Sequence, residues 1–122
     1  MREGRRILIV EDDYLIATLL AEVLETAGWR VVGPVGQLGE AVDAAVQEKF
    51  DAAVLDVNLG GKAVYPVAAV LDERHVPFVF LTGYGAETLQ RPFCGRPRLG
   101  KPFKTAELLG TVARLVDPAA GA

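Results

Sequence analysis

The sequence predicts an α/β protein in which a parallel sheet carries helices on both faces. Short apolar runs, typical of strands buried on both faces, alternate five times with segments of helical periodicity. Right-handed crossovers between such strands bring their carboxyl ends to one edge of the sheet. The chain has 122 residues, 51% of them hydrophobic and 24% charged, which suits one globular core. We therefore expect residues 1–122 to form a single domain, with its core at about 5–116 and a short C-terminal tail.

The first half of the chain begins with a clearly marked strand and helix. The apolar run Ile7–Val10 predicts a buried strand, and apolar residues recur at helical spacing over 15–27. Gly28 stands where a helix C-cap belongs, and 29–35 reads as the second strand. Apolar pairs four residues apart predict a second helix at about 41–50. The apolar stripe of the first helix is expected to lie in the core: Leu15, Leu19 and Val23.

The second half continues the alternation with weaker signals toward its end. Ala52–Leu55 and Phe78–Leu81 predict two more buried strands, with a helix over Val64–Leu71 between them. Pro66 is compatible with that helix because it falls in the first turn. We expect residues 58–62 to form a glycine-containing loop.

The last third is irregular before it ends in a helix. Gly and Pro residues within 83–97 leave only 86–90 for a short helix. A strand at 98–100 and an amphipathic helix at 105–116 complete the pattern.

Composition excludes several classes of function. The single Cys excludes an intramolecular disulfide and a Cys-rich zinc site. The net charge of −3 argues against direct binding to nucleic acid through phosphate contacts. No apolar run approaches the length of a membrane span, and the basic N-terminus lacks the apolar region of a signal peptide. We expect a cytoplasmic protein that does not contact the membrane.

Carboxylates follow two of the predicted strands. Glu11 and Asp12 come directly after the first strand, and Asp56 comes directly after the third. If these strands are neighbours, the three carboxylates meet at one sheet edge, where a divalent cation would relieve their repulsion. Hard oxygen ligands favour Mg²⁺, Mn²⁺ or Ca²⁺. Each carboxylate taken alone could simply end a strand or cap a helix, and for Asp13 we expect a helix N-cap.

Thr82 follows the fourth predicted strand and Lys101 follows the fifth. A threonine offers one hydroxyl donor, and a lysine offers a flexible positive charge that suits a phosphate group. Each residue alone is compatible with a turn or a solvated surface. Only the combination of these residues is specific. An acidic pair, an Asp, a Thr and a Lys each follow a different buried run.

These residues resemble the receiver domain of two-component response regulators. The run Ile7–Asp12 resembles its first strand and metal pair, Asp56 its phosphoacceptor, and Thr82 and Lys101–Phe103 its later signatures. The resemblance covers about residues 5–116. It implies the flavodoxin-like, CheY-like (βα)5 fold, a three-layer sandwich with a five-stranded parallel sheet in the order 2-1-3-4-5.

A narrower resemblance concerns the run Pro77–Tyr84, which reads PFVFLTGY. It is similar to the PFxFATGY motif of a receiver subgroup, with Leu81 in place of the usual Ala. Members of that subgroup are often stand-alone domains of alphaproteobacteria that pair with HWE or related histidine kinases. The resemblance thus implies a receiver without a DNA-binding output domain.

The resemblance also implies a mechanism. Asp56 would accept a phosphoryl group from a sensor histidine kinase or a histidine phosphotransfer protein, and the switch would alter binding to a downstream protein. Mg²⁺, or Mn²⁺ or another divalent cation in its place, would be bound by Asp12, Asp56 and the backbone carbonyl of Asn58, with Glu11 acting through water. Lys101 and Thr82 would contact the phosphoryl group. Homodimer formation is left open.

One position departs from the family pattern. Receivers typically carry a Tyr or Phe three residues before the signature Lys, and here that position is Arg98. Tyr84, two residues after Thr82, is a candidate to replace that aromatic switch, and it could equally be an ordinary loop residue. We expect the stretch 83–97 to be the element that moves.

Two alternative functions stay open at this stage. A non-phosphorylated interaction module of the same fold usually lacks the Asp, the acidic pair or the Lys, and this chain has them all. An Mg²⁺-dependent phosphohydrolase of similar fold would have an Asp-x-Asp pair after the first strand. Here Asp56 follows the third strand, and the residue two positions later is Asn58. The sequence favours a signalling switch that is not an enzyme.

Overall fold

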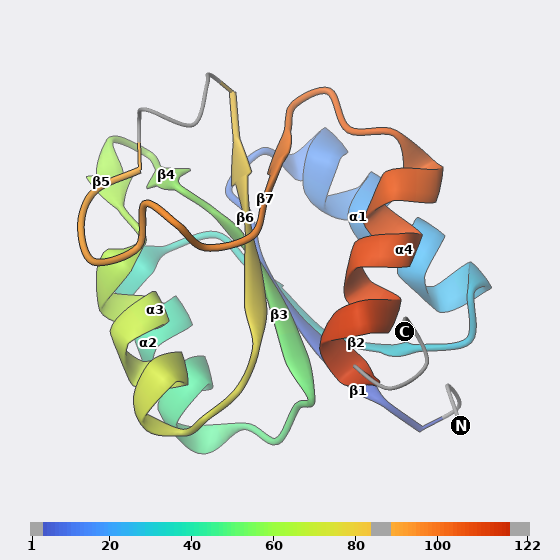
Figure 1. Cartoon of the computed structure of the whole chain (residues 1–122), viewed down its shortest axis with the longest axis horizontal. Coiled ribbons are helices and arrows are strands. Elements are labelled where there is room, and N and C mark those ends of the chain that lie inside the picture. The colour runs from blue at the N-terminus through green and yellow to red at the C-terminus, as the bar shows by residue number, and fades with distance from the viewer. Residues whose placement is uncertain (1–3, 84–88, 118–122) are drawn as a thin grey trace.

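Five parallel strands form the central sheet of the molecule (Figure 1). The structure is a computed structural model that describes residues 4–83 and 89–117. The sheet has the order β2-β1-β3-β6-β7, which is the predicted order 2-1-3-4-5 of its strands along the chain. The strands span β1 Arg6–Val10, β2 Arg30–Val35, β3 Ala52–Asp56, β6 Phe78–Thr82 and β7 Arg98–Gly100.

Helices cover both faces of this sheet and produce three layers. In Figure 1, α1 and α4 lie on one side of the strands and α2 and α3 on the other. Positions 86–88 of the short helix expected at 86–90 lie outside the described residues, and positions 89 and 90 are not helical. The described helices are α1 Tyr14–Thr26, α2 Leu38–Gln47, α3 Tyr65–Glu73 and α4 Thr105–Val116.

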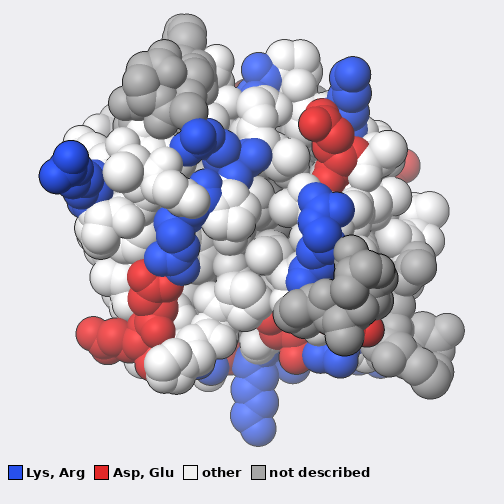
Figure 2. All heavy atoms as spheres, in the orientation of Figure 1, with Lys and Arg blue, Asp and Glu red and all other residues white. Residues whose placement is uncertain are grey.

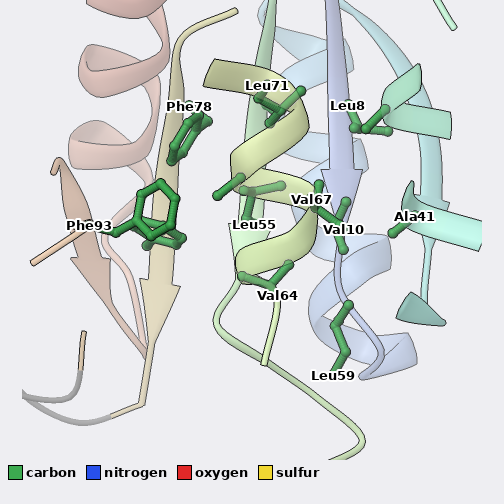
Figure 3. Packing of buried hydrophobic residues seen from close by; sticks show 14 of the residues in the cluster. Leu8, Val10, Ala41, Leu55, Leu59, Val64, Val67, Leu71, Phe78 and Phe93 are labelled. Atoms are coloured by element: carbon green, nitrogen blue, oxygen red, sulfur yellow. The ribbon is translucent and has the colours of Figure 1, made fainter. Parts of the chain in front are cut away.

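The sheet separates two hydrophobic cores. On the α2/α3 side, Val67 and Leu71 of α3 pack in one cluster with Leu8 and Leu55 of the central strands (Figure 3). On the α1/α4 side, the cluster contains Trp29, which precedes β2 and is 4% exposed. β1 and β3 contribute side chains to both clusters, as expected from their continuous apolar runs.

The start of α1 agrees with the sequence, but its buried face does not. Asp13 is the N-cap, because its Oδ1 accepts hydrogen bonds from the backbone N–H groups of Leu15 and Ile16. The expectation of a buried Leu15 stripe is wrong, because Leu15 is 77% exposed and Leu19 is 49% exposed, while Val23 is only partly buried. Apolar residues occupy more than one face of this helix, and the face against the sheet carries a different set: Ala17, Leu20 and Leu24.

A small hairpin replaces the loop expected at 58–62. β4 (Asn58–Leu59) pairs with β5 (Lys62–Ala63) in antiparallel fashion. Gly60 and Gly61 join them with φ values of +56° and +91°, and positive φ at both central residues is what a type I′ turn requires. Leu59 is 3% exposed and anchors the hairpin in the α2/α3 core (Figure 3).

Aromatic rings hold the irregular segment 89–97 against α3 and β6. The ring of Phe93 stacks on Tyr65 at 5.5 Å between centroids and meets the ring of Phe80 edge-on at 5.9 Å. The backbone N–H of Gln90 donates a hydrogen bond of 2.8 Å to the hydroxyl oxygen of Tyr65. Arg96 forms a paired hydrogen bond with the carboxylate of Asp72 near the end of α3.

Among the described residues, no helix has both the length and the apolar character needed to cross a bilayer. Basic and acidic side chains both occur on the face seen in Figure 2.

Candidate functional site

The strand register brings the predicted site residues to one end of the sheet. Asp56 is the last residue of β3 and pairs with Leu81, and Thr82 is the last residue of β6 and pairs with Gly100. Lys101 follows β7 directly, and its backbone N–H donates a 2.8 Å hydrogen bond to the carbonyl oxygen of Thr82. The carboxyl ends of four adjacent strands therefore meet, as the sequence predicted.

Three carboxylates gather at this edge. Oxygen atoms of Glu11, Asp12 and Asp56 all lie within 4.8 Å of one another. Glu11 is 2% exposed and Asp56 is 6% exposed, whereas Asp12 faces the solvent. This is the cluster predicted from the carboxylates that follow the apolar runs Ile7–Val10 and Ala52–Leu55.

Lys101 lies between the two buried carboxylates. Its Nζ is 2.8 Å from Oε1 of Glu11 and 3.2 Å from Oδ2 of Asp56. Burial favours the neutral amine, but the hydrogen bond with Glu11 and the charges of both carboxylates outweigh it and raise the pKa of Lys101. The lysine is thus held in its charged form beside Asp56.

Asp56 is difficult to ionise in this arrangement. Burial is the largest cause, and the hydrogen bond and charge of Glu11 add to it, so that the pKa of Asp56 rises from 3.8 to about 7. The backbone N–H of Asn58, 3.2 Å from Oδ1, and the charge of Lys101 act in the opposite direction. A further positive charge in the cluster would favour the ionised form of Asp56. The potential metal ligands in the cluster are all oxygen atoms, which suits a hard divalent cation.

The cluster opens into a cleft of about 490 Å³. Asp12, Asp56 and Lys101 line it together with Thr82, which is 6% exposed. The hairpin forms one wall through Asn58, Gly60 and Gly61. The cleft therefore offers carboxylate oxygens to a cation, and a lysine charge and a threonine to a small anionic group.

The residues proposed as switch elements are only partly described. Tyr84 lies outside the described residues, as do positions 85–88 of the stretch expected to move. Arg98 is exposed, and its guanidinium donates a 2.9 Å hydrogen bond to the carbonyl oxygen of Cys94. The side chain of Arg98 thus contacts the preceding segment at the surface of the molecule.

Sequence reasoning missed one contributor to the site. The backbone N–H of Gly60 donates a 2.9 Å hydrogen bond to Oδ2 of Asp12. A Gly-Gly pair between two short segments is a recognised hairpin signal, so the turn itself could have been anticipated. Its contact with Asp12, 48 positions away in the chain, could not.

Comparisons with known proteins cover most of the chain. Residues 7–113 match the family described as the response regulator receiver domain. The transcriptional regulatory protein PdtaR of Mycobacterium tuberculosis is 33% identical over 121 residues, which cover 93% of this chain and 57% of PdtaR. The chain spans about half the length of the curated relatives it matches.

Solved structures extend the comparison. SdrG from Sphingomonas melonis Fr1 is 41% identical with a TM-score of 0.81, covering 92% of this chain and 96% of SdrG. A BeF3-activated conformation of SdrG has a TM-score of 0.78 at 39% identity, covering 95% of this chain and 99% of that one. The receiver domain of the sensor histidine kinase PA1611 from Pseudomonas aeruginosa, solved with magnesium coordinated in its active-site cleft, is 30% identical with a TM-score of 0.76, covering 93% of this chain and 98% of that one.

Proposed function

Because the chain belongs to the response regulator receiver domain family, we propose that Asp56 is its phosphoacceptor in a two-component phosphorelay. The observation that carries this proposal is the convergence of the acidic cluster, Thr82 and Lys101 in one cleft. Receiver domains are typically signalling modules without an enzymatic reaction of their own.

Metal binding is the first part of the proposal. Asp12, Asp56 and the backbone carbonyl of Asn58 would hold Mg²⁺, with Glu11 acting through water, and Mn²⁺ or another divalent cation could replace it. The acidic cluster supports this assignment, as does the magnesium found in the cleft of the PA1611 receiver domain. The ion would supply positive charge that keeps Asp56 ionised and balances the oxygens of the incoming group.

Phosphoryl transfer is the second part. A carboxylate oxygen of Asp56 attacks the phosphorus of a phosphohistidine, the phosphorus–nitrogen bond breaks, and the imidazole leaves with the bonding electron pair. Lys101, already charged at 3.2 Å from Asp56, balances the charge of the phosphoryl oxygens. The hydroxyl of Thr82 donates a hydrogen bond to one of these oxygens. Because that bond forms only after phosphorylation, it favours one of two conformations.

The proposed phosphoryl donor is a sensor histidine kinase, such as one of the HWE type, or a histidine phosphotransfer protein. Exposed apolar side chains at the start of α1, next to the cluster, support docking of another protein: Tyr14 at 80% and Leu15 at 77% exposure. A downstream protein would read the phosphorylated state. The BeF3-activated form of SdrG supports a second conformation for receivers of this kind.

Intact mass spectrometry tests the proposal. The chain is incubated with acetyl phosphate and MgCl₂, and Asp56→Asn is the matched control. We expect one phosphoryl group on the wild type, none on the variant, and none on the wild type when a chelator removes the metal. If the wild type gains no mass from acetyl phosphate or from a phosphorylated histidine kinase, the chain is an interaction module of receiver fold. Sustained release of phosphate from small esters would instead indicate a phosphohydrolase.

A further inference from the structure

The orientation of Asp12 depends on a different part of the chain. Glu11 and Asp56 are buried, and Lys101 contacts both of them. Asp12 faces the solvent, and the hydrogen bond that the structure gives its carboxylate comes from the backbone N–H of Gly60. An exposed Asp side chain otherwise samples several rotamers, which lowers its effectiveness as a ligand.

The donor of this bond lies on a rigid support. Gly60 and Gly61 have the positive φ values of a type I′ turn, and the backbone N–H of Gly61 donates a 2.7 Å hydrogen bond to Oδ1 of Asn58. Leu59, buried to 3% exposure, fixes the hairpin to the α2/α3 core. The N–H of Gly60 therefore points at Asp12 from a position that the core determines.

We infer that the β4–β5 hairpin is a positioning element for metal binding, because the N–H of Gly60 binds Oδ2 of Asp12 and so restricts the orientation of a carboxylate that would bind the cation. This inference rests on the proposed metal site and adds to it a residue with no side chain. Hydrogen bonds that orient metal ligands commonly change metal affinity by about 10–100-fold when they are lost. Substitution of Gly60 should therefore affect metal binding, although Gly60 is exposed.

The chain offers a matched pair of variants at this position. Gly60→Asn retains the backbone N–H and the turn, because Asn-Gly is a favoured type I′ pair. A Cβ at Gly60 would lie 3.8 Å from Oδ2 of Asp12, which is an ordinary contact. Gly60→Val is incompatible with a φ of +56°, because a β-branched side chain rarely adopts the left-handed region. Val112→Ala in α4 serves as a control that lowers stability on the α1/α4 side, away from the hairpin.

The experiment is a titration of each variant with MgCl₂ by isothermal titration calorimetry. We expect Gly60→Val to weaken Mg²⁺ binding about tenfold. Gly60→Asn should stay within about twofold of the wild type, and Val112→Ala should bind as the wild type does. If Gly60→Val binds Mg²⁺ normally, or if Val112→Ala weakens binding equally, the positioning role is overturned while the proposed function stands. Failure of the wild type itself to bind Mg²⁺ would overturn the metal site and this inference together.

A second measurement does not depend on Gly60→Val being folded. In ¹H–¹⁵N NMR spectra, the Gly60 amide proton should move upfield and exchange faster in Asp12→Ala, because it loses its acceptor. The amide of Gly39, at the start of α2, serves as the control and should not change. An unchanged Gly60 signal in Asp12→Ala would also overturn the inference.

Discussion

At the scale of single residues, the surroundings of Asp56 disfavour its ionised form. Its raised pKa means that the folded chain binds a proton there which the unfolded chain releases above about pH 4. For this group, the free energy of unfolding therefore falls as the pH rises from about 4 to about 7 and is constant above that range. The cause is the burial of Asp56 beside Glu11, which the single charge of Lys101 offsets only in part.

Asp56→Asn should accordingly stabilise the metal-free protein. In EDTA at about pH 8, we expect the variant to unfold with a free energy about 2 kcal/mol above that of the wild type, because a buried charge is removed. The difference should shrink toward about pH 4. It should also shrink in saturating Mg²⁺, which stabilises only a chain that binds it. Urea titrations followed by circular dichroism measure these differences, and equal stability of the two proteins at every pH would contradict this account of Asp56.

At the scale of structural elements, the segment 89–97 is attached to both ends of α3. Tyr65, the first residue of α3, contacts Gln90 and Phe93, and Arg96 reaches Asp72 near the other end of the helix. The guanidinium of Arg96 also lies 4.7 Å from the ring centre of Phe78. The hydrogen bond from Arg96 lowers the pKa of Asp72, although burial opposes it, so this contact stabilises the fold above the pH at which Asp72 is protonated.

Arg96→Ala should therefore destabilise the chain by about 1 kcal/mol, most of it from the lost contacts with the aromatic rings. The ion pair itself contributes little, because both side chains are more than one-third exposed. Arg98→Ala, at the start of β7 directly after this segment, is the matched control, and it should change stability by less than about 0.5 kcal/mol. Urea titration near neutral pH compares the two, and most of the difference should persist in acid, where protonation of Asp72 removes only the small contribution of the ion pair. Equal effects of the two variants would show that the aromatic contacts of Arg96 contribute nothing.

The elements differ in how well the sequence predicts them. Ile7–Val10 and Ala52–Leu55 were predicted because burial on both faces leaves a continuous apolar run. The prediction of which face of α1 is buried was wrong. Leu15 and Leu19 have helical spacing, but spacing alone does not determine which face packs against the sheet. The Gly60-Gly61 pair signals a turn, but the strands of the hairpin could not be predicted because two-residue strands leave no periodic pattern.

The features of the site also differ in how well the sequence predicts them. Asp12, Asp56, Thr82 and Lys101 could be placed together because each follows a buried run, and the topology of a parallel sheet fixes where such residues meet. The ion pair between Lys101 and Glu11 could not be predicted, because it depends on side-chain geometry that no spacing encodes.

At the scale of the whole molecule, β1 and β3 belong to both cores and should be the most stable part of the fold. Residues 7–10 and 52–55 are fully buried, whereas β2 and β7 are edge strands with exposed residues. We expect amide hydrogens of β1 and β3 to exchange only through global unfolding, and those of β2 and β7 to exchange faster through local opening. Native-state hydrogen exchange measures this order. Slower exchange in β7 than in β3 would contradict the central role of the shared strands.

The position of Trp29 has a practical consequence for such measurements. It is the one tryptophan of the chain, and it lies in the α1/α4 core just before β2, at the end of the strands opposite to the cleft. Its intrinsic fluorescence therefore reports the integrity of that core and should be insensitive to what occupies the cleft. Unfolding curves recorded with and without a cleft ligand can thus be compared directly, because the emission of the folded state is the same in both.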